Sequence, residues 1–194
     1  MRIAVAFCIW LIPLAASFSQ EPAEIPSHAD LAFEQKDWSL AIRNYQAVLE
    51  SDSLNGHAWL RIAQAQRALG LYVQALKTLE SAFIVGAREA MIEFERARNF
   101  ANLGRTEDSL VALSRANESG LRALSSLEGA EEFKAVRLRG EFQEIYSAIR
   151  RRVFPCEGIA GSEDLDFWVG DWEVRLADGS LAGRSQVTRQ DGGC

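Results

Sequence analysis

The sequence predicts a mainly α-helical protein: a solenoid of about three helix-turn-helix repeats with a capping helix, followed by a short β-hairpin region. Three observations lead to this prediction. Amphipathic helical patterns recur with a constant period of about 34 residues. Glycines stand at or near the breaks between these patterns, where a residue that tolerates positive φ ends a helix. After residue 165 the pattern changes to the aromatic and β-branched residues typical of strands.

The period is visible when positions one repeat length apart are compared. Such a set of positions, which we call a column, holds side chains of the same type. One column holds small residues, as expected where two helices pack closely: Ala41, Ala75 and Ser109. A second column holds large residues: Tyr45, Leu79 and Leu113. The expected turns hold Lys36, Gly70 and Gly104. A fixed period of this length with these residue types indicates a repeated helix-turn-helix unit.

The stretch with the most regular pattern, residues 56–89, resembles a tetratricopeptide (TPR) repeat. The positions where that family has large, small, glycine and aromatic residues hold Trp59, Ile62, Ala63, Gly70, Tyr72, Ala75, Leu79 and Ala82. Residues 22–55 resemble a degenerate first copy, and residues 90–123 resemble a third copy in which Glu93 replaces a bulky apolar residue. The resemblance implies a TPR-type solenoid over residues 28–123, but it says little about function.

The helices can be placed in order from the periodicity and from local start signals. The expected ranges are 28–34, 38–51, about 57–69, 72–84, 88–103 and 106–118. Thr106 is a start signal, because its hydroxyl can cap a helix and two acidic residues follow it. Residues 121–153 keep a helical period but are expected to leave the register of the repeats. We expect residues 124–153 to form capping helices that cover the last apolar face of the array.

The N-terminal segment has the composition of a signal peptide. Arg2 provides a positive charge, residues 3–16 form an apolar run, and small residues follow at Ser17 and Ser19. We therefore expect residues 1–19 to be removed, residues 20–27 to form a flexible lead-in, and the protein to be periplasmic or secreted. The alternative is an uncleaved anchor. The run is short for a membrane span, so no stable span is expected after cleavage.

The C-terminal region changes from helical to strand-like sequence. Residues 154–164 contain proline and glycine and are expected to form a linker. Residues 168–176 are rich in aromatic and β-branched residues that alternate in part, as they do in strands. Asp178-Gly179 is a strong hairpin signal, and residues 181–189 can return as a second strand. We interpret residues 165–194 as an incomplete β-domain, since an isolated hairpin is marginally stable in water.

The start of this region resembles a family of secreted bacterial proteins whose domain opens with the phrase DFWxGxWxV, here residues 166–174. That domain is a lipocalin-like up-and-down β-barrel. In the resemblance, Gly170 permits a tight backbone approach and Trp172 closes one end of the barrel. It implies binding of a small ligand by a barrel of which only the first strands are present, with the repeats as a spacer or assembly arm.

The TPR resemblance also implies a binding surface, because in that family the first helix of each repeat lines a concave groove. Carried over column by column, the groove presents Leu60, Arg61, Gln64, Arg67, Phe94, Arg98 and Asn102. Arg67 and Arg98 could hold a carboxylate of a partner. The family's carboxylate clamp needs lysine and asparagine where Leu60 and Gln64 stand, so that specificity is not implied. The alternative is that these residues only solvate the groove or contact the chain's own lead-in.

Composition and motifs bear on the remaining classes of function. The 194-residue chain has a formal net charge of −6, which argues against general binding of nucleic acid. Its two histidines, His28 and His57, lack metal-ligand spacing, and no nucleophile or phosphate-loop motif occurs, so we predict no cofactor and no enzyme activity. Export would favour a disulfide between Cys156 and Cys194, with two separate thiols as the alternative. The favoured function is an exported interaction module that binds a peptide or helix of a protein partner.

Overall fold

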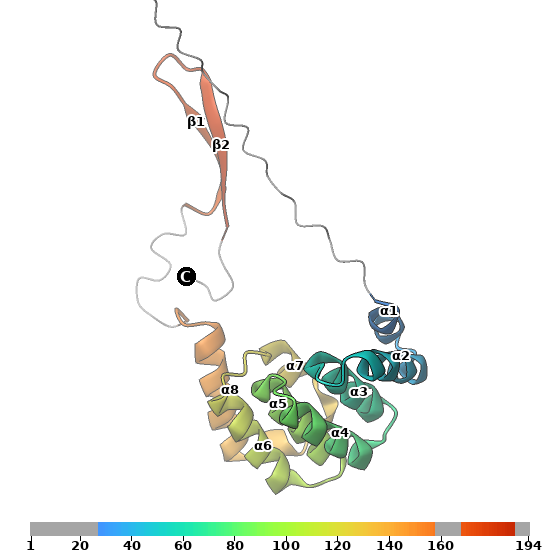
Figure 1. The fold of residues 1–194 in the computed structure, drawn as a ribbon. Coiled ribbons are helices and arrows are strands. Elements are labelled where there is room, and N and C mark those ends of the chain that lie inside the picture. The colour runs from blue at the N-terminus through green and yellow to red at the C-terminus, as the bar shows by residue number, and fades with distance from the viewer. Residues whose placement is uncertain (1–26, 158–167, 189–194) are drawn as a thin grey trace, which may run out of the picture.

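The computed structural model describes residues 27–157 and 168–188. Its helical elements are α1 His28–Glu34, α2 Trp38–Ser51, α3 Gly56–Ala68, α4 Tyr72–Ile84, α5 Glu89–Asn102, α6 Thr106–Glu118, α7 Leu124–Gly129, the 3-10 turns η1 Glu131–Phe133 and η2 Val136–Leu138, and α8 Gly140–Val153. The strands are β1 Gly170–Arg175 and β2 Leu181–Val187. From α1 to α6 each helix packs against the next, and Figure 1 shows the resulting stack. A mainly helical solenoid followed by a short hairpin confirms the predicted fold class.

Some predicted segments lie outside the described residues. These are the signal peptide 1–19, all but the last residue of the lead-in 20–27, and most of the linker 154–164. Both ends of the predicted β-region 165–194 are also outside them. The expectations for these segments therefore stay predictions.

The turn inside each of the first three repeats uses the same backbone conformation. Lys36, Gly70 and Gly104 have φ angles of 60°, 77° and 71°. This left-handed region is free of steric cost for glycine but not for lysine. The second helix of each repeat starts two residues after this turn residue, at Trp38 for α2 and at Tyr72 for α4. The period in the sequence is thus also a period in the backbone.

Small side chains let the two helices of each repeat approach closely. Ala41, Ala75 and Ser109 are all fully buried, as the column of small residues predicts. Ser109 fits in this column because its Oγ donates a hydrogen bond to the carbonyl oxygen of Ala97 at 2.9 Å. A buried hydroxyl with that partner avoids the cost of an unpaired polar group.

The last helix of the capping segment keeps the repeat spacing at its start but not the residue columns of the repeats. α8 begins at Gly140, one full period after the start of α6 at Thr106. Only the buried face changes, because α8 buries Phe142, Ile145 and Ile149. A shift of one full repeat from a buried residue of α6 leads to an equivalent position in α8. Each buried residue of α8 lies one residue before such a position. One residue corresponds to a rotation of about 100° around the helix axis.

The first helix of this last unit is broken into α7, η1 and η2. Arg137 stabilises the break, because its NH2 group donates to the carbonyl oxygens of Leu127 at 3.2 Å and Ala130 at 2.8 Å. The break brings Phe133 of η1 into the core, where its ring centroid lies 6.1 Å from that of Phe94 and 6.2 Å from that of Phe142. The capping segment and the third repeat therefore share one hydrophobic core.

The two strands form an antiparallel hairpin, as predicted. At its turn the Asp178 carboxylate accepts a hydrogen bond from the backbone N–H of Ser180 at 2.9 Å. Gly170 starts β1 with a φ of 142°, a conformation that other residues rarely adopt. Trp172 and Val174 lie on one face of the hairpin and are 37% and 54% exposed. Within the described residues, this apolar face does not belong to a hydrophobic core.

Candidate functional site

The predicted groove corresponds to one face of the first helices α1, α3 and α5, continued by η1. We call it the first-helix face. Its side chains are Phe33, Arg61, Gln64, Arg67, Glu95, Arg98 and Glu132. They are far apart in the sequence but linked in one chain of contacts, which runs from the third repeat to the first.

Glu95 on α5 is the centre of this face. Its side chain is only 2% exposed. One carboxylate oxygen, Oε2, accepts a hydrogen bond from Nε of Arg67 on α3 at 2.9 Å. The other, Oε1, accepts from Nε2 of Gln64 at 3.2 Å and from NH1 of Arg98 at 3.4 Å. Three donors therefore compensate a buried negative charge, which would otherwise be strongly unfavourable.

Glu132 on η1 closes the network from the capping segment. Its Oε1 accepts a hydrogen bond from Nε of Arg98 at 2.5 Å and lies 3.6 Å from NH1 of Arg67. Burial raises the pKa of the Glu132 carboxyl, but a backbone hydrogen bond and the two guanidiniums outweigh it and hold that pKa below the usual 4.5. Glu132 is thus charged at neutral pH and bridges two arginines from different helices.

Arg61 extends the network towards the first repeat. Its NH1 donates to Oε1 of Gln64 at 3.2 Å, and its Nε donates to Nε2 of His57 at 3.2 Å. The guanidinium also lies 4.4 Å from the ring centroid of Phe33 on α1, in cation–π geometry. Nearby, the Tyr45 hydroxyl donates to Oδ1 of Asp30 at 2.6 Å. The polar surface therefore runs continuously from α1 to η1.

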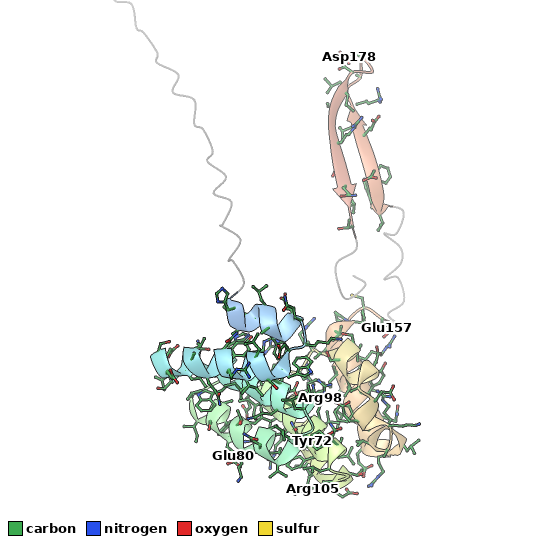
Figure 2. All side chains as sticks on the ribbon, turned by 90° about the vertical axis from the view of Figure 1, so that its right-hand side faces the viewer. Tyr72, Glu80, Arg98, Arg105, Glu157 and Asp178 are labelled. Carbon is green, nitrogen blue, oxygen red and sulfur yellow. The ribbon has the colours of Figure 1, made fainter. Side chains whose placement is uncertain are left out.

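The structure brings together four of the seven residues predicted for the groove: Arg61, Gln64, Arg67 and Arg98. Leu60 is half-buried and packs against the core between the second and third repeats. Asn102 is exposed at the end of α5, where its side chain donates to the carbonyl oxygen of Arg98 at 2.9 Å. Arg98 is labelled in Figure 2.

Phe94 does not line the groove, so that prediction is wrong. Its side chain is 1% exposed and lies in the core of the third repeat. The physical reason is the capping segment, which places Phe133 against it. The two arginines also differ from expectation, because the carboxylates that they hold belong to Glu95 and Glu132 of the same chain.

Glu132 is the member of the first-helix face that sequence reasoning missed. It stands one full period after Arg98, so the columns of the repeats would have found it. The prediction that residues 121–153 leave the register of the repeats kept the columns from being extended to Glu132. Among the described residues, no group of three or more histidine, cysteine or acidic side chains could hold a metal ion. In the same part of the chain, no helix has the length and apolarity that a membrane crossing requires.

Cys156 follows α8 and is disulfide-bonded. Cys194, its predicted partner, lies outside the described residues. The pairing of these two cysteines therefore stays a prediction.

Comparison with known proteins agrees with the repeat pattern. The tetratricopeptide repeat family matches residues 32–91. No curated protein matches the chain. Similar solved structures include MamA, with a TM-score of 0.49, 16% identity and coverage of 71% of this chain and 77% of that one. The type III secretion chaperone SycD of Yersinia enterocolitica, in complex with a peptide of the translocator YopD, has a TM-score of 0.47 and 19% identity, covering 63% and 86%. The TPR2B domain of yeast Sti1, in its pHsp70 complex, has a TM-score of 0.46 and 14% identity, covering 64% of this chain and 91% of that one.

Proposed function

We propose that this protein is an exported interaction module that binds a peptide or helix of a protein partner on its first-helix face. The observation that carries the proposal is the network in which Glu95 and Glu132 fix the side chains of Arg67 and Arg98. Fixed guanidiniums lose less conformational entropy when they bind than free surface arginines do. A recognition surface that is ordered in advance is what binding of an extended or helical segment requires.

The charge of this face indicates which partner it accepts. Arg61, Arg67 and Arg98 bring three positive charges against the two negative charges of Glu95 and Glu132. These five side chains therefore retain one positive charge, which favours an acidic side chain or a terminal carboxylate of a partner beside α3 and α5. Arg67 and Arg98 remain 17% and 19% exposed, so their outer edges stay accessible to such a group.

Matched peptides test this proposal while the natural partner is still unidentified. A library of short helical peptides would contain each sequence twice, once with glutamate and once with glutamine. Fluorescence polarisation would then measure the affinity of each pair for the mature chain. We expect glutamate peptides to bind more tightly, and Arg67→Met or Arg98→Met to reduce that preference by about tenfold. The exposed Arg43→Met on α2 is the control, and we expect it to change nothing.

Equal binding of both members of every pair would contradict the charge preference. Binding that survives the double substitution Arg67→Met with Arg98→Met would move the site away from the first-helix face. Circular dichroism of each variant should show unchanged helical content. A loss of binding without a loss of helix therefore reports on the surface itself.

A second function is favoured by the hairpin. Trp172 and Val174 expose an apolar face while Glu173 on the opposite face pairs with Arg184 on the neighbouring strand at 3.3 Å. We infer that a two-faced hairpin of this kind belongs to a larger barrel that binds a small apolar ligand, with the repeats as a spacer. The test is to add apolar ligands to a natural protein that contains further strands and to measure its tryptophan fluorescence. No change in fluorescence with any ligand would argue against this second function.

A further inference from the structure

A cleft of about 450 Å³ lies on the other side of α5 from the first-helix face. α4 and α6 form its walls, and α5 lies between them. Glu80 of α4 and Arg105, which precedes α6, are among the residues that line it, and both are labelled in Figure 2. No part of the first-helix network lines this cleft, so it is a separate feature of the molecule.

Glu93 of α5 lines the cleft. It stands one period after Trp59, in the column where the repeat pattern has a bulky apolar side chain. A glutamate is smaller than a tryptophan, so the position is incompletely filled. Glu93 is nevertheless 3% exposed. Its Oε1 accepts from NH1 of Arg96 at 2.6 Å, whereas its Oε2 is buried without a hydrogen-bond partner among the described residues.

A buried carboxylate oxygen without a partner is unfavourable unless a donor reaches it. A ligand for this cleft therefore needs a hydrogen-bond donor, and an ammonium group is the strongest one for a carboxylate. Apolar side chains of Leu76, Phe100 and Val111 line the rest of the cleft. They suit an apolar body of a few carbon atoms.

The rim adds a second requirement. The acidic and basic side chains that line the cleft are equal in number, so a ligand of zero net charge fits best. Arg105 is engaged by Asp108 at 2.7 Å. Arg115 on α6 makes no ion pair within the described residues and is free to hold a carboxylate.

We propose that this cleft is a second binding site that takes a small zwitterion with an apolar body, as a free amino acid presents. On binding, the Glu93 carboxylate turns into the cleft so that its Oε2, buried in the free protein, accepts from the ligand's ammonium, and Arg115 holds the ligand's carboxylate. The site is independent of the first-helix face and of the function proposed for it.

Three matched probes test both ends of the ligand. Leucine has an ammonium, a carboxylate and a branched apolar body. Isoamylamine lacks only the carboxylate, and isocaproate lacks only the ammonium. Amide NMR spectra of the mature chain, titrated with each probe, should show shifts of α4, α5 and α6 residues around the cleft. We expect leucine to bind at least about tenfold more tightly than either of the other two probes.

Substitutions assign the two contacts. Glu93→Gln should weaken leucine binding by about tenfold while keeping the size of the side chain. Arg115→Gln should remove the preference of leucine over isoamylamine. Val111→Phe fills the cleft without changing a polar group and should abolish binding of all three probes. The exposed Glu118→Gln on α6 and Arg67→Met on the first-helix face are controls that should bind leucine like the parent.

Several outcomes would overturn the proposal. If no probe shifts the cleft residues, the cleft does not bind a ligand of this class. If isoamylamine binds as tightly as leucine, the carboxylate is not recognised. Leucine binding that survives both Glu93→Gln and Val111→Phe would place the ligand elsewhere. Failure of peptide binding at the first-helix face would leave this result untouched, because Arg67→Met separates the two sites.

Discussion

Nε of Arg98 on α5 donates a hydrogen bond over 2.5 Å to Oε1 of Glu132 on η1, a residue one full period further along the chain. The contact joins the third repeat to the capping segment. It also occupies a guanidinium that we propose for partner binding. Glu132 therefore stabilises the fold and at the same time competes with an incoming carboxylate.

Replacing this carboxylate should separate the two roles. Glu132→Gln is expected to reduce the free energy of unfolding by about 2 kcal/mol, because a hydrogen bond between charged groups is lost in a partly buried site. The same change should raise the affinity for acidic peptides, since Arg98 and Arg67 gain a free donor. Urea unfolding and peptide polarisation measure the two effects. Glu107→Gln, which removes an exposed partner of Arg139, is the control and should cost less than about 1 kcal/mol.

The stabilisation by Glu132 should depend on pH. Its pKa in the folded protein is lower than the usual 4.5, so the folded state favours the charged form. The contribution is therefore fully present above pH 4.5 and is lost as the pH falls through the lower folded-state pKa. We expect the difference in unfolding free energy between the parent and Glu132→Gln to shrink as the pH falls below 4.5 and through the lower folded-state pKa. A difference that stays constant over this range would refute the assignment.

The first repeat is held by a hydrogen bond that can be removed cleanly. The Tyr45 hydroxyl donates to Asp30 at 2.6 Å, and Tyr45 is 2% exposed. Tyr45→Phe should reduce the unfolding free energy by about 1 kcal/mol. Hydrogen bonds from Ser27 and Tyr45 lower the pKa of the Asp30 carboxyl, so the substitution should also raise that pKa towards 3.8 in an NMR titration. Tyr72→Phe, at a half-buried tyrosine of α4, should alter neither quantity.

The column of small residues should not tolerate a larger side chain. Ala75 is completely buried where α4 meets α3. Ala75→Leu should destabilise the protein by about 1–3 kcal/mol, because the added atoms force the helices apart. Thermal unfolding followed by circular dichroism measures this loss. The neighbouring exposed Gln74→Leu carries the same side chain on the surface, and a similar loss for both would disprove the packing explanation.

The natural protein should carry both predicted covalent features. We expect its N-terminus at Gln20, after removal of residues 1–19. We also expect its mass to increase by about 2 Da on reduction, because Cys156 and Cys194 would each gain a hydrogen. Intact mass spectrometry with and without reductant measures both. A mass that includes Arg2 and Cys8 would instead support an uncleaved anchor.

Much of the fold followed from side-chain size and spacing. The columns of Ala75 and Gly70 predicted the close helix contacts and the turns, because those positions accept few residue types. Asp178-Gly179 predicted the hairpin for the same reason. These features depend on local geometry, which a sequence expresses directly.

The candidate site was less predictable because it depends on contacts between distant segments. Arg67 and Arg98 were found from their column, but Glu132, which contacts both of them, was not. Glu132 lies in a segment whose first helix is broken, so no periodic pattern of apolar residues marks it. Phe94 was misplaced because only the folded chain shows that Phe133 covers it.

The rotation of α8 also determines how many repeats can stack. Another repeat would dock on the positions of α8 that are equivalent to the buried positions of α6. Two of these positions hold the exposed polar residues Gln143 and Glu144. The apolar residues that could have received it, such as Ile145, are already turned inward. A one-residue shift in hydrophobic phase is thus enough to end the array while the helix keeps its starting position. In this protein, the position at which a helix starts and the face on which it carries its apolar residues vary independently. The second of these determines whether another repeat can dock.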